Sequence, residues 1–127
     1  MKICVITDIH SNVFALRAAL AEIDRIKPDK IVCLGDIVGN GAYPEETVQL
    51  IKSRKDITCV CGNHDFIVLA DLEKFSKEDV RLKGFKWQQR VLSNNSKEFL
   101  SGLKKEYRFT AEGLRVVCFH YPKRGGR

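Results

Sequence analysis

Along the first half of the chain, short continuous apolar runs alternate with segments in which apolar residues recur at helical spacing. The apolar runs rich in β-branched residues, which are typical of buried strands, lie at 2–7, 30–34 and 57–61. Between them, apolar residues recur at helical spacing over 12–26 and over 45–53. An order of strand, helix, strand, helix and strand predicts a parallel α/β sheet.

The second half of the chain predicts further helices and a closing pair of strands. The helical segments are expected at 64–73, 77–93 and 96–103. The two strands are expected at 106–111 and 114–120, with a turn at Glu112 and Gly113. We find no internal repeat, low-complexity tract or linker, and we therefore expect a single domain over residues 1–127.

The composition is that of a globular protein. Hydrophobic residues make up 44% and charged residues 30% of the 127 residues. No apolar run approaches the ~18 residues that a membrane span requires, and the apolar start at 3–6 is too short for a signal peptide. We expect a cytoplasmic protein that does not associate with membranes.

The formal net charge of +6 favours an anionic substrate and is also compatible with nucleic acid. The basic residues are spread over 74–108 and the end of the chain, and no basic run is interleaved with aromatic residues. We therefore interpret most of this charge as solvated surface and rank nucleic-acid binding as the weakest hypothesis.

The five cysteines lie in runs rich in valine and isoleucine, and their odd number argues against a disulfide framework. They are Cys4, Cys33, Cys59, Cys61 and Cys118. We interpret them as small buried apolar side chains. A thiolate metal pair at Cys59 and Cys61 is the alternative, which known zinc-ligand spacings do not favour.

Polar residues suited to metal binding and proton transfer follow the predicted strands. They are Asp8, His10, Asp36, Asn63, His64, Asp65 and His120, and they include all three histidines of the chain. A single Asp or Asn at a strand end is ordinarily a turn or helix cap. The carboxyl ends of parallel strands, however, meet at the edge where α/β proteins bind ligands. We therefore expect these side chains to lie together in one site.

The chemistry of these groups indicates a metal centre. Carboxylate, amide and imidazole ligands suit Mn, Fe, Zn, Co or Ni. Asp8 and His10 are two residues apart and can point the same way from an extended segment. A central carboxylate at Asp36 can bridge two ions about 3.5–4 Å apart. Such a pair clamps a phosphate and lowers the pKa of a bridging water, which predicts hydrolysis of a phosphate ester.

Three short motifs stand at the ends of the first three predicted strands. They are Asp8-x-His10, Gly35-Asp36 and Gly62-Asn63-His64-Asp65. In order and spacing this set resembles the calcineurin-like metallophosphoesterases, and segments 8–12 and 35–44 resemble their small prokaryotic phosphodiesterase-like branch. The resemblance is strong over residues 2–70 and weak over 71–120. It implies an α/β fold in which two sheets form a sandwich flanked by helices.

The resemblance also implies a pair of divalent ions as cofactors, with Mn as the leading candidate. Asp8 and His10 would be ligands of one ion. Asn63 and His120 would be ligands of the other, and Asp36 would bridge the two.

Catalytic roles follow from the same resemblance. Asn63 and His64 would contact the substrate, and His64 would protonate the leaving oxygen while Asp65 orients its ring. The implied reaction is hydrolysis of phosphodiester or phosphomonoester bonds by a hydroxide that bridges the metals. The implied substrate is a phosphorylated small molecule or a nucleotide.

The end of the sequence departs from the family pattern. Family members carry a later Gly-His-x-His block, whereas this sequence has no histidine after His120, which is followed by Tyr121 and Pro122 where the family usually has glycine. We therefore expect a C-terminally shortened domain with three protein ligands for each metal. It is either an active hydrolase or a truncated, degenerate member that binds metal or phosphate weakly and has an interaction or regulatory role.

Such a shortened sheet would leave an edge or an apolar face uncovered, and exposed edges tend to pair with another chain. We therefore expect a homodimer, or a chain whose end at 123–127 has no regular structure.

Overall fold

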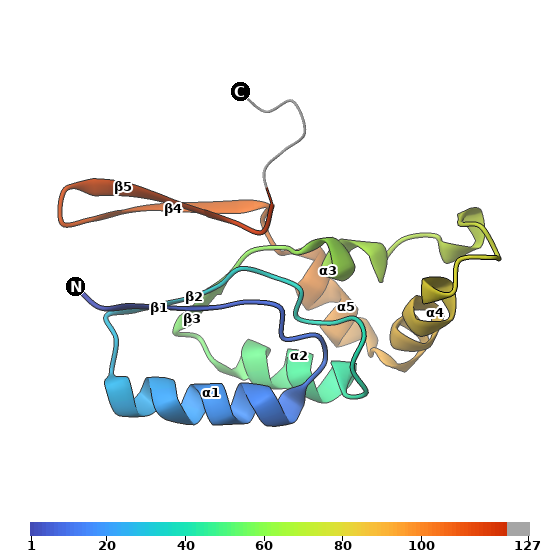
Figure 1. The fold of residues 1–127 in the computed structure, drawn as a ribbon, viewed down its shortest axis with the longest axis horizontal. Coiled ribbons are helices and arrows are strands. Elements are labelled where there is room, and N and C mark those ends of the chain that lie inside the picture. The colour runs from blue at the N-terminus through green and yellow to red at the C-terminus, as the bar shows by residue number, and fades with distance from the viewer. Residues whose placement is uncertain (122–127) are drawn as a thin grey trace.

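The computed structural model describes residues 1–121, and this part of the chain contains two sheets with helices around them (Figure 1). The parallel sheet has the order β1-β2-β3, with β1 at Ile3–Ile6, β2 at Lys30–Cys33 and β3 at Ile57–Cys59. The antiparallel hairpin consists of β4 at Glu106–Ala111 and β5 at Leu114–Phe119. This arrangement confirms the predicted α/β fold. The expectation about residues 123–127 lies outside the described residues.

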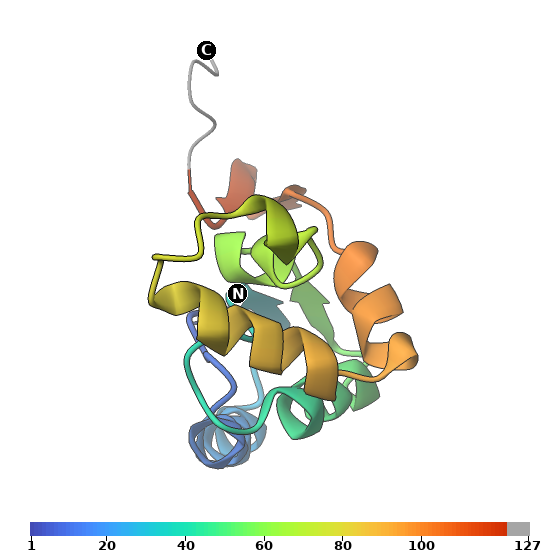
Figure 2. The ribbon, with the colours of Figure 1, turned by 90° about the vertical axis from the view of Figure 1, so that its right-hand side faces the viewer.

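The helices cover one face of the parallel sheet and the edge at which the carboxyl ends of its strands lie. They are α1 (Val13–Ile26), α2 (Pro44–Ser53), α3 (Asn63–Ile67), the 3-10 helix η1 (Leu72–Lys74), α4 (Arg81–Val91) and α5 (Asn94–Ser101). Helices α1 and α2 lie on the side of the sheet opposite the hairpin (Figure 1). Viewed from the carboxyl ends of the strands, α4 passes in front of the sheet (Figure 2). Within residues 1–121, no helix combines the length and the apolar character that crossing a membrane requires.

Local sequence explains the first crossover helix. The side chain of Asn12 accepts a hydrogen bond from the amide of Ala15 and caps the start of α1. The buried residues of α1 recur every three or four positions and pack against the sheet; they are Val13, Leu16, Leu20 and Ile23. At the end of α1, Lys27 adopts the left-handed conformation that commonly terminates helices. The predicted helix and its apolar stripe are confirmed.

The helical region after β3 differs from the prediction. The expected segment 64–73 is divided into α3 and η1, because the Asp71 carboxylate accepts from the amide of Glu73 and starts a new turn. The expected segment 77–93 becomes helical only at Arg81, whose amide is capped by Asp79. Periodicity does not reveal such side-chain caps, since they interrupt a helix without changing its apolar pattern.

The hydrophobic core lies mainly between the parallel sheet and α1 and α2. Val32 and Cys33 of the central strand β2 are fully buried. All five cysteines in the described residues are free, with Cys33 and Cys118 buried and the other three half-buried. The prediction of buried cysteine side chains is therefore confirmed for Cys33 and Cys118 only.

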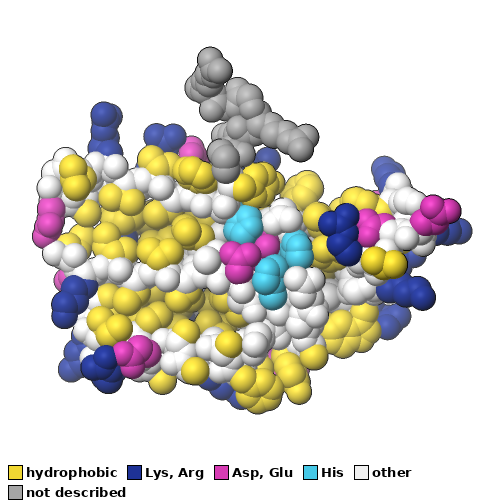
Figure 3. Space-filling view, viewed as in Figure 1, with side chains coloured by type: hydrophobic (Ala, Val, Ile, Leu, Met, Phe, Trp, Pro, Cys, Tyr) yellow, Lys and Arg dark blue, Asp and Glu magenta, His cyan; other side chains and the backbone are white. Residues whose placement is uncertain are grey.

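An apolar strand face, which we define by Ile3, Val5, Val117 and Phe119, remains exposed. Hydrophobic side chains cover much of the surface over β1 and the hairpin (Figure 3). Val5 is 54% exposed and Phe119 is 42% exposed. Among the described strands, β1 is at the edge of its sheet. Exposed apolar side chains beside an unpaired strand edge are typical of a surface that binds another polypeptide.

A carboxylate on α2 connects this helix to α5. Oε1 of Glu45 accepts from the hydroxyls of Ser93 and Ser96 at 2.7 and 2.8 Å, and Oε2 accepts from the amide of Ser93 at 3.0 Å. Burial raises the pKa of the Glu45 carboxyl, but these hydrogen bonds together outweigh it and hold that pKa below its ordinary value of 4.5. The ionised form of Glu45 therefore stabilises the fold.

We expect Glu45→Gln to lower the free energy of unfolding by about 1 kcal/mol at neutral pH, because a neutral amide is a weaker acceptor. Since the pKa of Glu45 is lower in the folded state, this stabilisation is present above the ordinary pKa of 4.5 and is lost as the pH falls through the folded value. Urea unfolding at neutral and at acidic pH measures the difference, with Glu46→Gln, its exposed neighbour, as control. A destabilisation that is the same at both pH values contradicts this assignment.

Candidate metal centre

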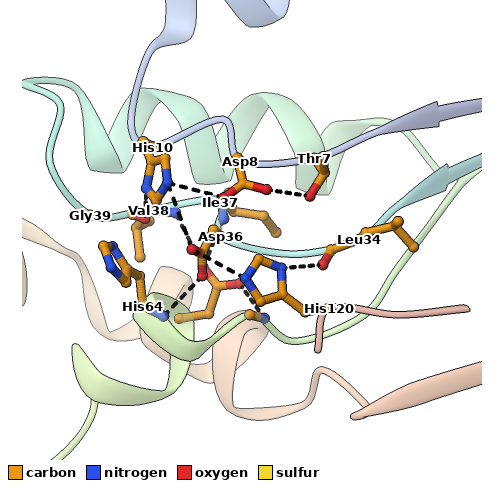
Figure 4. Close-up of polar contacts among 12 residues, drawn as sticks. Thr7, Asp8, His10, Leu34, Asp36, Ile37, Val38, Gly39, His64 and His120 are labelled. Atoms are coloured by element: carbon orange, nitrogen blue, oxygen red, sulfur yellow. Dashed lines mark hydrogen bonds and ion pairs between the residues drawn. The ribbon is translucent and has the colours of Figure 1, made fainter. Parts of the chain in front are cut away.

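The carboxylate of Asp36, just after β2, is at the centre of the predicted site (Figure 4). Asp36 is only 3% exposed. Its Oδ2 lies 3.6 Å from Nε2 of His10 and 3.4 Å from Nε2 of His120. Its Oδ1 accepts a hydrogen bond from the amide of His64 at 2.9 Å. A buried carboxylate requires a compensating positive charge, which protonated imidazoles or a metal ion can supply.

Two histidines are held so that the same ring nitrogen faces Asp36. Nδ1 of His10 lies 3.3 Å from the carbonyl oxygen of Val38, and Nδ1 of His120 lies 2.8 Å from that of Leu34. A carbonyl oxygen only accepts, so each Nδ1 is the donor and Nε2 is free to be a ligand. Metal-binding histidines in proteins are oriented in this way.

Asp8 brings a second carboxylate to the cluster. Its Oδ1 lies 3.3 Å from Nε2 of His10, and its Oδ2 accepts from the hydroxyl of Thr7 at 2.7 Å. The Thr7 hydrogen bond, together with the nearby His120 and His10, lowers the pKa of the Asp8 carboxyl. Asp8 is therefore an anion at neutral pH.

The backbone that carries these ligands is in an unusual conformation. The φ angles of Asp8, His10 and Asp36 are 56°, 50° and 52°, in the left-handed region that residues other than glycine rarely adopt. Two backbone hydrogen bonds hold the segment after β1 beside the segment after β2. The amide of Asp8 donates to the carbonyl of Gly35 at 3.0 Å, and the amide of His10 donates to the carbonyl of Asp36 at 2.9 Å. Backbone strain of this kind is concentrated at functional sites.

Gly62 brings the end of β3 close to Asp36. A Cβ atom at this position would overlap both the backbone nitrogen and Oδ1 of Asp36. Only glycine therefore allows the third motif to approach the central carboxylate.

His64 lies at the border of the cluster. Its ring centroid is 4.8 Å from that of His10, and the ring packs edge-on against Phe85 at 5.1 Å. Nδ1 of His64 is buried and has no hydrogen-bond partner among residues 1–121. Burial lowers the pKa of His64, although the charge of Asp36 opposes this shift.

Asp65 does not orient His64, so the predicted contact between them is wrong. Oδ1 of Asp65 accepts from the amides of Ile37 and Val38 at 2.9 and 3.1 Å, and Oδ2 accepts from the amide of Gly62 at 3.0 Å. These backbone groups occupy both carboxylate oxygens. Burial raises the pKa of the Asp65 carboxyl to about 6. The observed role of Asp65 is to tie the loop after β2 to the start of α3.

His120 reaches the cluster by a different route from the one predicted. We expected it at the end of a strand of the parallel sheet, but β5 belongs to the antiparallel hairpin. The hydrogen bond to the carbonyl of Leu34 places its ring beside Asp36 (Figure 4). The sequence therefore placed His120 near Asp36 for an incorrect topological reason, and its role as a metal ligand stays a prediction.

Two overlapping groups of side chains are candidate metal ligands, and within each group the potential ligand atoms lie within 4.8 Å of one another. The groups are His10, Asp36 and His64, and Asp8, Asp36 and His120. Asp36 belongs to both, in agreement with a bridging carboxylate. The grouping differs from the predicted one, in which Asp8 and His10 share an ion, and the division of ligands between the ions stays a prediction.

The side-chain amide of Asn63 also lies within this cluster. One of its terminal atoms lies 3.1 Å from Nε2 of His120 and 3.2 Å from each carboxylate oxygen of Asp36. An amide nitrogen at this position donates to these acceptors, whereas an amide oxygen requires a cation among them. The oxygen and nitrogen donors of the site suit divalent Mn, Fe, Zn, Co or Ni. The residues present therefore fit a divalent metal centre.

Sequence analysis missed Gln88, which holds α4 against the site. This side chain is 2% exposed. Its Oε1 accepts from the hydroxyl of Ser11 and the amide of Gly39, both at 3.0 Å, and its Nε2 donates to the carbonyl of Gly41 at 2.7 Å. A glutamine within a polar helix gives no signal in the sequence, because the same residue is common on exposed helix faces.

Comparison with known proteins links this geometry to a family. The model of the calcineurin-like phosphoesterases, Metallophos, matches residues 1–123. The uncharacterized protein MJ0912 of Methanocaldococcus jannaschii is 41% identical over 122 residues, which cover 93% of this chain and 48% of that protein.

Solved structures share the fold. The crystal structure of a metallophosphoesterase from Sphaerobacter thermophilus is 31% identical with a TM-score of 0.68, and the match covers 84% of this chain and 43% of that one. The hypothetical protein PH1004 from Pyrococcus horikoshii OT3 has a TM-score of 0.81 at 23% identity, over 91% of this chain and 53% of that one, and this likeness concerns the fold alone. The chain spans about half the length of these relatives.

We expect MnCl₂ to stabilise the protein against thermal unfolding, because an ion that binds only the folded state adds about 2.7 kcal/mol at 100 times its dissociation constant. Asp36→Asn should abolish this increase in melting temperature, since it removes the only carboxylate common to both ligand groups. Differential scanning calorimetry measures the effect, with Asp24→Asn on the exposed side of α1 as the matched control. An equal Mn effect in Asp36→Asn contradicts a metal centre at this position.

Proposed function

The chain belongs to the calcineurin-like phosphoesterase family, and on this basis we propose that it is a metal-dependent hydrolase of phosphate esters. The observation that carries the proposal is the convergence of the Asp8 carboxylate and two oriented imidazoles around the buried Asp36. Divalent ions bound there would polarise the phosphoryl oxygens and lower the pKa of a bound water. Among the metals that suit these donors, we propose manganese because of the resemblance to the family.

The protein itself contributes a rigid arrangement of ligands. The carbonyls of Val38 and Leu34 fix the rings of His10 and His120, so that no rotation is needed before ligand binding. The left-handed backbone at Asp36 is held by hydrogen bonds to the segment after β1. This preorganisation supports catalysis because charges already in place need no reorganisation during the reaction.

We assign to His64 the contact with the phosphate and the transfer of a proton to the leaving oxygen. Its ring borders the metal ligands on one side and a cavity on the other. Burial lowers the pKa of His64, so that its protonated form releases a proton more readily than an ordinary imidazolium. Asp65 supports this function indirectly, since its backbone contacts fix the loop that precedes the histidine.

The proposed substrates are phosphorylated small molecules or nucleotides, as phosphodiesters or phosphomonoesters. The net charge of +6 favours the approach of such anions. Because this chain matches only about half of its relatives, the activity of the isolated chain is itself part of the proposal.

We expect the protein to hydrolyse bis-p-nitrophenyl phosphate in the presence of Mn, and His64→Gln to lower kcat by about 10²–10⁴ because it removes the proton donor. Release of p-nitrophenol measures the rate. The control is the Mn-induced increase in the melting temperature of the His64→Gln variant. This increase is retained if His64 acts on the substrate and is reduced if His64 is a metal ligand. A wild-type protein that binds Mn but has no turnover contradicts the hydrolase and favours a binding role.

We also propose that the apolar strand face pairs with a second copy of this chain, because its exposed side chains flank the free edge of β1. Val5→Lys should convert a dimer into a monomer by placing a charge on this face, whereas Phe14→Lys on exposed α1 should not. Sedimentation velocity over a range of concentrations measures the change. A wild-type protein that is monomeric throughout contradicts the dimer.

A further inference from the structure

A cavity of about 390 Å³ lies between the loop after β2, the start of α3 and the helix α4. This size falls in the range of small-molecule sites, about 300–1,000 Å³. The residues important for its chemistry are Asn40, His64, Val80, Arg81, Phe85 and Trp87. His64 is shared with the metal centre, and Phe85 packs against its ring.

The walls of the cavity present flat apolar surfaces. Phe85 and Trp87 supply two aromatic rings, and Trp87 is 37% exposed. Val80, at 87% exposed, adds apolar surface from the start of α4. At Gly84 a built Cβ atom would meet nothing within 4 Å, so the space between these side chains is open. Aromatic side chains around an open space are suited to stacking on a planar group.

The helix that forms this wall is anchored before any ligand binds. Nε2 of Gln89 donates to the carbonyls of Val68 and Ala70, both at 2.9 Å, and Lys86 pairs with Glu73 at 3.0 Å. The contacts of Gln88 with the loop after β2 add a third attachment. A preformed cavity reduces the entropic cost of binding, so its aromatic rings are available for recognition.

The cavity is next to the reacting group. The ring of Phe85 packs edge-on against His64, whose ring in turn lies 4.8 Å from that of His10. A molecule with its phosphate at the metal ligands therefore has its organic part beside Phe85. The charge of Arg81 is already shared with Asp79, at 3.1 Å, so the walls favour a planar group over a second anion.

We propose that this cavity is the binding site for the planar heterocycle of a nucleotide substrate, which stacks on Phe85 and Trp87 while its phosphate lies at the metal centre. The assignment rests on the proposed function, since the phosphate position depends on the metal ligands. It defines a substrate class, nucleotides rather than sugar or alkyl phosphates, and it makes Phe85 and Trp87 the residues that determine specificity.

The first test compares two ligands that differ only in the base. Because Trp87 is the single tryptophan of the chain, its fluorescence reports on the cavity directly. AMP should change this fluorescence and bind about tenfold more tightly than ribose 5-phosphate, the size of effect that base stacking gives. Phenyl phosphate distinguishes a general aromatic site, which binds it as tightly as AMP, from a site for a nucleotide base. Equal binding of AMP and ribose 5-phosphate overturns the proposal.

The second test removes one ring while conserving apolar volume. Phe85→Leu should reduce the preference for AMP over ribose 5-phosphate at least fivefold in calorimetric titrations, and Phe66→Leu, on exposed α3, should not. Trp87→Leu, followed by the same calorimetry, should act like Phe85→Leu. A preference for AMP that survives both changes overturns the assignment of the cavity.

The two proposals fail in different ways. A protein that prefers AMP through Phe85 but hydrolyses neither AMP nor bis-p-nitrophenyl phosphate retains the cavity assignment and loses the hydrolase. A protein that hydrolyses AMP and ribose 5-phosphate with equal kcat/KM retains the hydrolase and loses the cavity assignment.

Discussion

The burial of one negative charge, the carboxylate of Asp36, is the constraint on which the site depends. At 3% exposure, an unpaired carboxylate would cost several kcal/mol. The carboxylate of Asp8 lies beside His10, and both His10 and His120 turn Nε2 toward Asp36. An assembly of acceptors of this kind is stable when a cation occupies its centre. The left-handed backbone and the close approach of Gly62 are then consequences of bringing these acceptors together.

Periodicity and strand-end chemistry predicted the parallel sheet, its crossover helices and the set of site residues, because apolar spacing and ligand type are local properties. The roles of Asp65 and Gln88 could not be predicted. Both side chains act through hydrogen bonds to backbone groups that are distant in sequence, such as the amides of Ile37 and Gly39. His120 shows the same limit, since it arrives from a hairpin whose position over the sheet no local pattern encodes.

The site lies between two surfaces of different character. On one side, α4 and its glutamines hold an aromatic cavity beside His64, where we propose that the substrate is selected. The apolar strand face over β1 and the hairpin lies beside the group of histidine and acidic side chains (Figure 3). The relatives compared here are about twice as long as the matched region. The proposed metal binding, base recognition and self-association would therefore involve different surfaces of this chain.

The central claim is that four segments surround a shared pair of cations. Anomalous diffraction from crystals grown with Mn tests it most directly, because the signal locates the ions independently of activity. The account predicts two peaks about 3.5–4 Å apart, one on each side of the Asp36 carboxylate. Full occupancy of Mn at another place, or no anomalous peak beside Asp36, would contradict it.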